Sequence, residues 1–320
     1  MKPGSLTIAL FLLCSFTACR PGPEVSEQGS ISASAPAPAT TSAANPETAA
    51  TAVPETASTT ATPGNSGPSL STDAPGRISE QEQDALAPPT LYGYRVVRSY
   101  PHDPEAFTQG FTYHEGLFYE GTGLEGASSL RVVRPETGEV LKLHQLPPDI
   151  FGEGITLAGD RIVQVSWKNQ QAFIYDRQTL KPIQRLRYAM AEGWGITYDG
   201  TRLIMSDGSA NLYFLHPGDL SETGRITVRE QGQPVDRLNE LEYIQGEVWA
   251  NIWGSDDLVR IQPATGRVTG RIKLKGLLPA SERTPQTDVL NGIAFDAAAG
   301  RIFVTGKNWP RVFEIEVRIQ

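Results

Sequence analysis

Cysteine is nearly missing from this chain of 320 residues, which contains only Cys14 and Cys19. Both lie within the first twenty residues, so the rest of the chain has no disulfide and no thiol for catalysis or metal binding. Histidine is also scarce, and the four histidines show no metal-ligand spacing. No G-x-S-x-G sequence occurs, and a serine-hydrolase triad is therefore without support.

Excess positive charge is missing too, because 36 Asp and Glu residues against 28 Lys and Arg residues give a net charge of -8. No basic stripe runs along the chain, and basic residues do not alternate with aromatic ones. A basic stripe and such alternation are the usual signs of a surface that binds nucleic acid, and this chain has neither. We therefore expect no nucleic-acid partner.

The N-terminal segment, residues 1–18, has the pattern of a secretory signal peptide, with an early Lys2 and an apolar run from Leu6 to Phe16. Its last residues and Cys19 form FTAC, which resembles the lipobox of bacterial lipoproteins except that Phe16 replaces the usual leucine. Arg20 follows, in place of the Asp that retains lipoproteins in the inner membrane. We therefore expect lipidation of Cys19 and anchoring in the outer membrane, facing the periplasm, with plain secretion as the alternative.

Residues 19–90 are rich in Ala, Pro, Ser, Thr and Glu and contain few large apolar residues. Such a segment cannot bury enough apolar surface to offset the entropy of ordering, which predicts a disordered tether. The folded domain is predicted to cover residues 91–320, a length that one β domain commonly reaches. We expect this domain to be monomeric, with the lipid on Cys19 as its only contact with a membrane.

Five segments of this domain repeat one pattern: an apolar strand, a turn, a second alternating strand and then a third strand. Each of the first four segments continues into a fourth strand. The segments begin, at steps of 41 to 52 residues, at Gln109, Glu153, Trp194, Asn239 and Asn291. Four short strands in roughly 40–45 residues is the period of a propeller blade.

The fifth segment reaches Gln320 without a fourth strand, and the stretch Tyr94–Tyr100 supplies a strand that no other segment uses. If the strand Tyr94–Tyr100 pairs with the last strand of the fifth segment, that segment has no open sheet edge. The sequence therefore predicts an all-β fold, a five-bladed β-propeller whose ring is closed by its N-terminal strand. An all-β sandwich would not explain the repeat.

The first strand of each blade lines the central channel of a propeller, so the five residues that begin the segments should meet at one mouth. They comprise one acid, three amides and one indole. The ends of the second strands predict a second ring: Thr122, Trp167, Asp207, Trp253 and Lys307. Phe107 and Phe151 lie two residues before Gln109 and Glu153 and add apolar walls. An apolar pocket with a few convergent polar groups is typical of a small-ligand site.

Each of these side chains also has a plain structural interpretation. A tryptophan near a strand end often packs in the core, and an amide after a turn often satisfies the backbone. Glu153 and Lys307, taken singly, can be solvated turn residues, and the glycines on either side of Glu153 predict a tight turn. Agreement in repeat position favours the shared site. A calcium site, as in some propeller lactonases, stays open; its ligands would be Glu153, Asp207, Asn239 and Asn291.

Seven short motifs, in order along the domain, resemble those of the plant and bacterial glutaminyl-peptide cyclotransferases. They are FTQGF, YEGTG, FGEGIT, LNELEY, VWANIW, LNGIAFD and FVTGKNWP, which lie between Phe107 and Pro310. The resemblance covers residues 94–320. The chain departs from the family at Gly121, where serine is common, and at Phe111, where leucine is common.

This resemblance implies a five-bladed propeller that converts the N-terminal glutamine of peptides or proteins to pyroglutamate and releases ammonia. It implies an acyltransferase of the aminoacyltransferase class that uses no metal or other cofactor. The family's cavity residues carry over to Phe107, Gln109, Phe151, Glu153, Trp167, Trp194, Asn239, Trp253 and Lys307. The repeat adds Asn291 to the predicted substrate-binding residues.

From the chemistry of this reaction we expect Glu153 to act as general acid and base and Lys307 to stabilise the oxyanion. The remaining residues would bind the substrate. Two other functions stay open: a calcium-dependent propeller hydrolase or lactonase, and a propeller that binds peptides without catalysis.

Overall fold

In a computed structural model of the chain, Gln83 and residues 85–320 are described. The expected signal peptide, Cys19 and all but the last few residues of the expected tether lie outside these residues. None of the helices in the described part is long and apolar enough to cross a membrane.

The described residues form an all-β fold, which confirms the predicted fold class. Three sheets each contain four consecutive antiparallel strands. The first has β2 (Thr108–His114), β3 (Leu117–Thr122), β4 (Ser129–Arg134) and β5 (Glu139–Gln145). The second has β6 (Gly152–Ala158), β7 (Arg161–Ser166), β8 (Gln171–Asp176) and β9 (Pro182–Arg187). The third has β10 (Ile196–Tyr198), β11 (Leu203–Ser206), β12 (Asn211–Leu215) and β13 (Glu222–Thr227).

A larger sheet of eight strands has the order β16-β17-β18-β19-β1-β22-β21-β20. One half has β16 (Leu238–Ile244), β17 (Glu247–Ile252), β18 (Asp257–Ile261) and β19 (Val268–Lys273). The other has β20 (Leu290–Asp296), β21 (Arg301–Gly306) and β22 (Arg311–Ile319). The short pair β14 (Arg229–Glu230) and β15 (Gln233–Pro234) precedes β16, and the 3-10 helix η1 (Ala280–Glu282) precedes β20.

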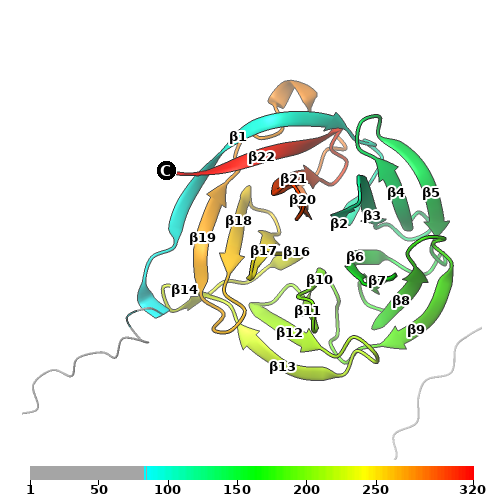
Figure 1. Cartoon of the computed structure of the whole chain (residues 1–320), viewed down its shortest axis with the longest axis horizontal. Coiled ribbons are helices and arrows are strands. Elements are labelled where there is room, and N and C mark those ends of the chain that lie inside the picture. Colours follow the sequence, from blue (N-terminus) through cyan, green and yellow to red (C-terminus); the bar gives the residue numbers. More distant parts are fainter. Residues whose placement is uncertain (1–82, 84) are drawn as a thin grey trace, which may run out of the picture. The chain divides into compact units, whose positions relative to one another are not determined.

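Strand β1 (Thr90–Pro101) joins the two halves of the large sheet. It runs antiparallel to β22 from Tyr92 to Pro101, with an irregularity in register at Val97, and its first three residues pair in parallel with β19. Figure 1 shows β1 along the outside of β22 and β19. The first strand of the domain thus pairs with its last one.

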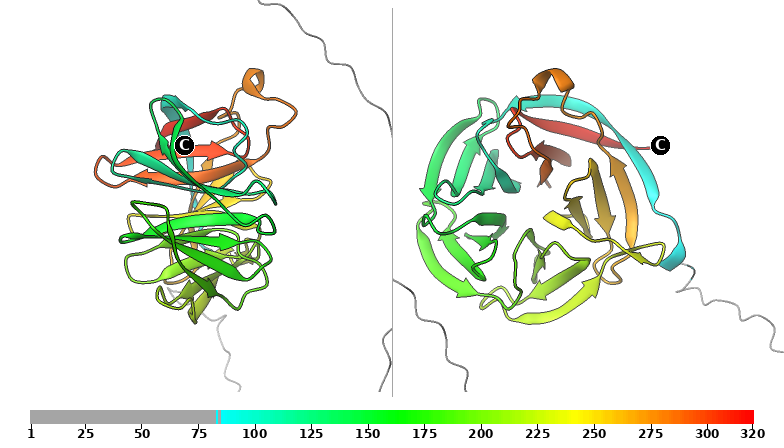
Figure 2. Two further views of the ribbon diagram at one scale, coloured as in Figure 1. Left: turned by 90° about the vertical axis from the view of Figure 1, so that its right-hand side faces the viewer. Right: turned by 180° about the vertical axis from the view of Figure 1, so that it is seen from behind.

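The sheets stand in a ring around one axis, with β2, β6, β10, β16 and β20 nearest to it (Figures 1 and 2). Strands at the outer edge, such as β5 and β9, are mostly exposed, whereas β2 and β6 are mostly buried. The apolar core lies between neighbouring sheets. Leu130 of β4, for example, belongs to the same buried cluster as Ile162 of β7. Because the apolar side chains are buried between neighbouring sheets, polar side chains can occupy the region near the axis of the ring.

Glycines let the inner strands approach one another closely. A Cβ atom on Gly110 would lie 2.2 Å from the backbone nitrogen of Ile155, and one on Gly195 would lie 2.0 Å from the carbonyl oxygen of Asn239. Gly154 donates a backbone hydrogen bond of 2.7 Å to the Trp194 carbonyl. The glycines beside Glu153 lie within strand β6, so the predicted tight turn is wrong. Close approach between strands explains Gly154 instead.

Candidate active site

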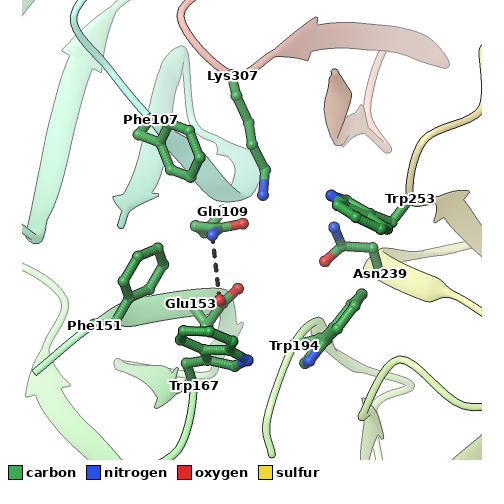
Figure 3. A pocket seen from close by; sticks show the side chains of 9 residues that line it. All are labelled: Phe107, Gln109, Phe151, Glu153, Trp167, Trp194, Asn239, Trp253 and Lys307. Carbon is green, nitrogen blue, oxygen red and sulfur yellow. Dashed lines mark hydrogen bonds between the residues drawn. The ribbon is translucent and has the colours of Figure 1, made fainter. Parts of the chain in front are cut away.

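One cavity of about 370 Å³ lies near the axis of the ring (Figure 3). Phe107 and Phe151 directly precede the inner strands β2 and β6, and Trp194 lies two residues before β10. Three further lining residues directly follow the second strands β7, β17 and β21. The full lining is Phe107, Gln109, Phe151, Glu153, Trp167, Trp194, Asn239, Trp253 and Lys307.

The polar residues on the inner strands lie at irregularities of strand register. Pairing between β2 and β3 shifts at Gln109, and pairing between β6 and β7 shifts at Glu153. Pairing between β16 and β17 shifts in the same way at Asn239. A bulge of this kind releases a residue from regular alternation and re-aims its side chain. The carboxylate and both amides therefore reach one cavity although they come from three different sheets.

Asn291, Thr122 and Asp207 were expected in the site but do not line this cavity. The Asn291 side chain is buried, and its Nδ2 donates a 2.9 Å hydrogen bond to the carbonyl oxygen of Thr108. Thr122 and Ser129 share a hydrogen bond of 2.8 Å between their hydroxyls, and Asp207 accepts one of 2.8 Å from Tyr213. In this structure Asn291 therefore ties β20 to the residue before Gln109.

Aromatic rings form most of the cavity wall, and they meet edge to face. The ring centroids of Phe107 and Phe151 are 6.2 Å apart, and those of Phe151 and Trp167 are 5.5 Å apart. On the other side, the centroids of Trp194 and Trp253 are 6.3 Å apart. Such contacts stabilise a fixed arrangement of rings. Trp253 is 45% exposed, and it therefore lies where the cavity meets solvent.

Glu153 and Lys307 are the two ionisable groups of the lining, and each is only 5% exposed. Burial raises the pKa of Glu153 well above its usual range; the charge of Lys307 opposes this rise and that of Glu192 adds to it. Burial also lowers the pKa of Lys307, against the charges of Glu153 and Asp288. Desolvation therefore moves both groups towards their neutral forms, which suits groups that exchange protons with a bound molecule.

Two amide side chains supply hydrogen-bonding groups. Gln109 Nε2 donates a 3.2 Å hydrogen bond to Glu153 Oε1 (Figure 3). Among the described residues, Gln109 Oε1 and Asn239 Oδ1 are buried and accept no hydrogen bond. Buried polar atoms of folded proteins nearly always have a partner. These two oxygens can therefore accept hydrogen bonds from N–H groups of a molecule in the cavity.

Sequence reasoning missed Glu192. Its Oε2 accepts hydrogen bonds of 2.9 Å from the indole nitrogens of both Trp167 and Trp194. Glu192 lies two residues before Trp194, the same offset that singled out Phe107 and Phe151. This offset therefore indicates Glu192 as a residue near the site, although it does not line the cavity.

No group of three or more His, Cys, Asp or Glu side chains placed to hold a metal ion occurs in the part of the chain that the structure describes. The cavity combines one carboxylate, one ammonium, two amides and five aromatic rings. This set is suited to a small molecule with N–H groups, an apolar segment and an oxygen that gains negative charge.

Comparison with known proteins agrees with this description. The family model described as glutamine cyclotransferase matches residues 70–317. A glutaminyl-peptide cyclotransferase of Arabidopsis thaliana is 44% identical over 228 residues, which is 70% of this chain and 71% of the plant protein. The crystal structure of Myxococcus xanthus glutaminyl cyclase is similar with a TM-score of 0.69 and 38% identity. That match covers 72% of this chain and 99% of the solved chain.

Proposed function

The chain belongs to the glutamine cyclotransferase family, and we propose that it converts the N-terminal glutamine of peptides or proteins to pyroglutamate. One observation carries the proposal: buried Glu153 and Lys307 share an aromatic cavity with unpartnered amide oxygens. The reaction moves an acyl group from one nitrogen to another, so the enzyme would be an acyltransferase of the aminoacyltransferase class.

The reaction is an intramolecular substitution. The neutral α-amine of the substrate attacks its own γ-carboxamide carbon, and a new C–N bond closes the five-membered ring. The bond from that carbon to the amide nitrogen then breaks. One proton moves from the α-nitrogen to the departing nitrogen, which leaves as ammonia. The enzyme must therefore move one proton and stabilise the oxygen that becomes negative in between.

Glu153 is the group proposed to move that proton. The reference pKa of an α-amino group is roughly 7.7–8.0, far above that of an exposed carboxylate. Burial raises the pKa of Glu153 and so brings it closer to the pKa of the substrate's α-amine. A small difference between the two pKa values favours proton transfer in both directions. Glu153 would accept the proton from the attacking amine and return it to the leaving ammonia.

Lys307 is proposed to stabilise the oxyanion. Its ammonium lies over the face of Phe107, 4.8 Å from the ring centroid, and Figure 3 shows it pointing into the cavity opposite Glu153. Hydrogen-bond donors of this kind are typically worth about 2.7–4 kcal/mol in the transition state. The free oxygens of Gln109 and Asn239 would accept hydrogen bonds from the substrate's amine and amide nitrogens.

The aromatic wall supports cyclisation over hydrolysis. Rings packed edge to face line a cavity of about 370 Å³, which has room for an N-terminal glutamine in a folded conformation. A folded glutamine holds its amine against its own amide carbon, so the attack has little orientational entropy left to lose. Apolar walls also exclude the water that would give glutamate instead.

For the fold, we propose a five-bladed propeller closed by its N-terminal strand. Three blades would be the three four-stranded sheets, and a fourth would be β16–β19. The fifth would consist of β20, β21 and β22 with β1 as its outer strand. The antiparallel pairing of β1 with β22 supports this assignment.

We also propose that the enzyme works in the cell envelope as a monomer with no cofactor. The signal-like residues 1–18 and the FTAC tetrad support lipidation of Cys19 and an outer-membrane anchor facing the periplasm, with secretion as the alternative. Residues 19–90 would be the tether between that anchor and the catalytic domain, except that Thr90, the last of them, is the first residue of β1. Peptides that begin with glutamine would be its partners, without nucleic acid.

The test is mass spectrometry of a glutamine-initiated peptide after incubation with the purified protein. We expect loss of one ammonia, whereas a hydrolase would replace the amide nitrogen by oxygen. Glu153→Gln should fold and lose about 10²- to 10⁴-fold in kcat, the usual contribution of general acid–base catalysis. The control is Glu125→Gln, which changes an exposed carboxylate outside the lining and should keep wild-type kcat. Unchanged peptide with the wild-type protein refutes the function, and a fully active Glu153→Gln refutes only the role of Glu153.

A further inference from the structure

We propose that Glu192 is a positioning residue that joins the two halves of the aromatic wall and thereby holds the cavity in the shape that cyclisation needs. This inference rests on the proposed function, and it assigns a task to a residue that does not itself line the cavity.

Glu192 lies at a break in the series of ring contacts around the cavity, between Trp167 and Trp194. Phe107, Phe151 and Trp167 contact one another in sequence, and Trp194 contacts Trp253. Between Trp167 and Trp194, the contact that links the two groups is the Glu192 carboxylate. Its Oε2 accepts a hydrogen bond of 2.9 Å from each indole nitrogen.

The two indoles come from neighbouring sheets, and each carries an N–H group that needs an acceptor. Trp167 directly follows β7, and Trp194 precedes β10 in the next sheet. An indole nitrogen can only donate a hydrogen bond, and bonds to a charged acceptor are roughly twice as strong as neutral ones. One carboxylate oxygen therefore fixes the orientation of both rings.

The backbone around Glu192 is itself held in place. Gly193 donates a 2.9 Å backbone hydrogen bond to the carbonyl oxygen of Trp167, and Trp194 donates one of 2.9 Å to that of Ser206. A Cβ atom on Gly193 would lie 2.5 Å from the hydroxyl of Tyr188, whose own hydrogen bond goes to the Ser166 carbonyl. The carboxylate is thus presented from a tightly packed segment.

The negative charge of Glu192 also acts on Glu153, the residue proposed to move the proton. It adds to the rise in the pKa of Glu153 that burial causes. Three other titratable groups surround this pair. Lys307 opposes the rise, Lys168 lies with its Nζ 3.7 Å from the ring centroid of Trp167, and both carboxylates act on buried Tyr188. Loss of the Glu192 charge should therefore lower the pKa of Glu153.

Two substitutions separate the hydrogen bonds from the charge. Glu192→Ala removes both, whereas Glu192→Gln keeps an oxygen that can accept from both indoles and removes only the charge. The matched control is Asp149→Asn, which neutralises an exposed acid two residues before Phe151 without touching an indole. Three measurements compare them: the indole N–H signals in ¹H–¹⁵N NMR spectra, kcat and KM, and the pH profile of kcat/KM. Trp167→Phe and Trp194→Phe assign the two signals.

In Glu192→Ala we expect both indole signals to shift and kcat/KM to fall about 100-fold, the effect of a misplacement of roughly 1 Å near reacting groups. Glu192→Gln should restore most of kcat/KM and move the acid-side midpoint of the profile to lower pH. Asp149→Asn should match the wild type in all three measurements.

Unshifted indole signals in Glu192→Ala would overturn the proposal, and so would a loss of activity that Glu192→Gln fails to restore. If the wild type itself forms no pyroglutamate, the proposed function is refuted. The indole signals still decide whether Glu192 holds the two rings, because they are read without substrate.

Discussion

The buried carboxyl group of Glu242 predicts that this protein loses stability as the pH rises from about 4.5 to about 8. Glu242 lies on the inner strand β16 and is 8% exposed. Its Oε1 accepts hydrogen bonds from the backbone nitrogen of Phe295, at 3.1 Å, and from Thr112, at 3.3 Å. Burial nevertheless dominates and raises the pKa of Glu242 from 4.5 to about 8. Removing this group by Glu242→Gln isolates its contribution.

The sign follows from linkage between folding and protonation. A carboxyl whose pKa is higher in the folded state favours folding in its protonated form. Its full contribution is present below pH 4.5, and the contribution is lost as the pH rises through about 8. At about 1.4 kcal/mol per pKa unit, this rise corresponds to a loss on the order of 5 kcal/mol in the free energy of unfolding. Glu240, whose pKa burial also raises, adds to the loss in the wild type.

Urea denaturation at pH 5, 7 and 9 measures this effect. Gln in place of Glu242 keeps an oxygen that can accept both hydrogen bonds, so Glu242→Gln should match the wild type at pH 5. At pH 9 it should be the more stable protein by several kcal/mol. Glu125→Gln, at an exposed position, should follow the wild type throughout. If the curves of Glu242→Gln and wild type stay parallel from pH 5 to pH 9, burial does not shift the pKa of this group and the reasoning fails.

Other predictions concern the cavity and the inner strands. Lys307→Met should lower kcat about 10²- to 10³-fold, as loss of an oxyanion donor does, and steady-state kinetics with unchanged kcat would contradict that role. Treatment with EDTA should leave kcat unchanged because the Lys307 ammonium beside the single lining carboxylate repels a divalent cation; a loss of activity that calcium restores would favour the hydrolase alternative. Gly110→Ala should lower the free energy of unfolding by about 1–3 kcal/mol or more, because its Cβ would lie 2.2 Å from backbone. Wild-type stability in urea would contradict that close approach.

Much of the fold can be read from local patterns in the sequence. Alternation of apolar residues and the repeat that begins at Gln109 predict an all-β domain, because a strand buries one face at period two. The order of short motifs places the chain in its family, which the family model confirms. Nine of the predicted site residues line one cavity, because equivalent positions in a repeat face the same axis. The roles of Glu153 and Lys307 in catalysis stay predictions.

Only the tertiary structure decides which of these residues reach the cavity. Asn291 occupies the repeat position of Gln109, yet it bonds to the backbone of a strand distant in the chain. The offset from Trp194 indicates Glu192, but the bridge that it forms between Trp167 and Trp194 depends on the packing of neighbouring sheets. Gly154 looked like a turn residue, whereas it allows contact between strands.

The physical reason is the range of the forces involved. The alternation of apolar and polar residues that marks a strand is a local pattern, so period and composition are enough to predict where strands lie but not which strands pair. The direction of a side chain at a bulge depends on the register of a hydrogen-bonded partner strand, and the pKa of a carboxylate depends on everything that excludes water from it. Both are settled by contacts between segments that are far apart in the chain, such as Phe107, Glu153 and Lys307 around one cavity.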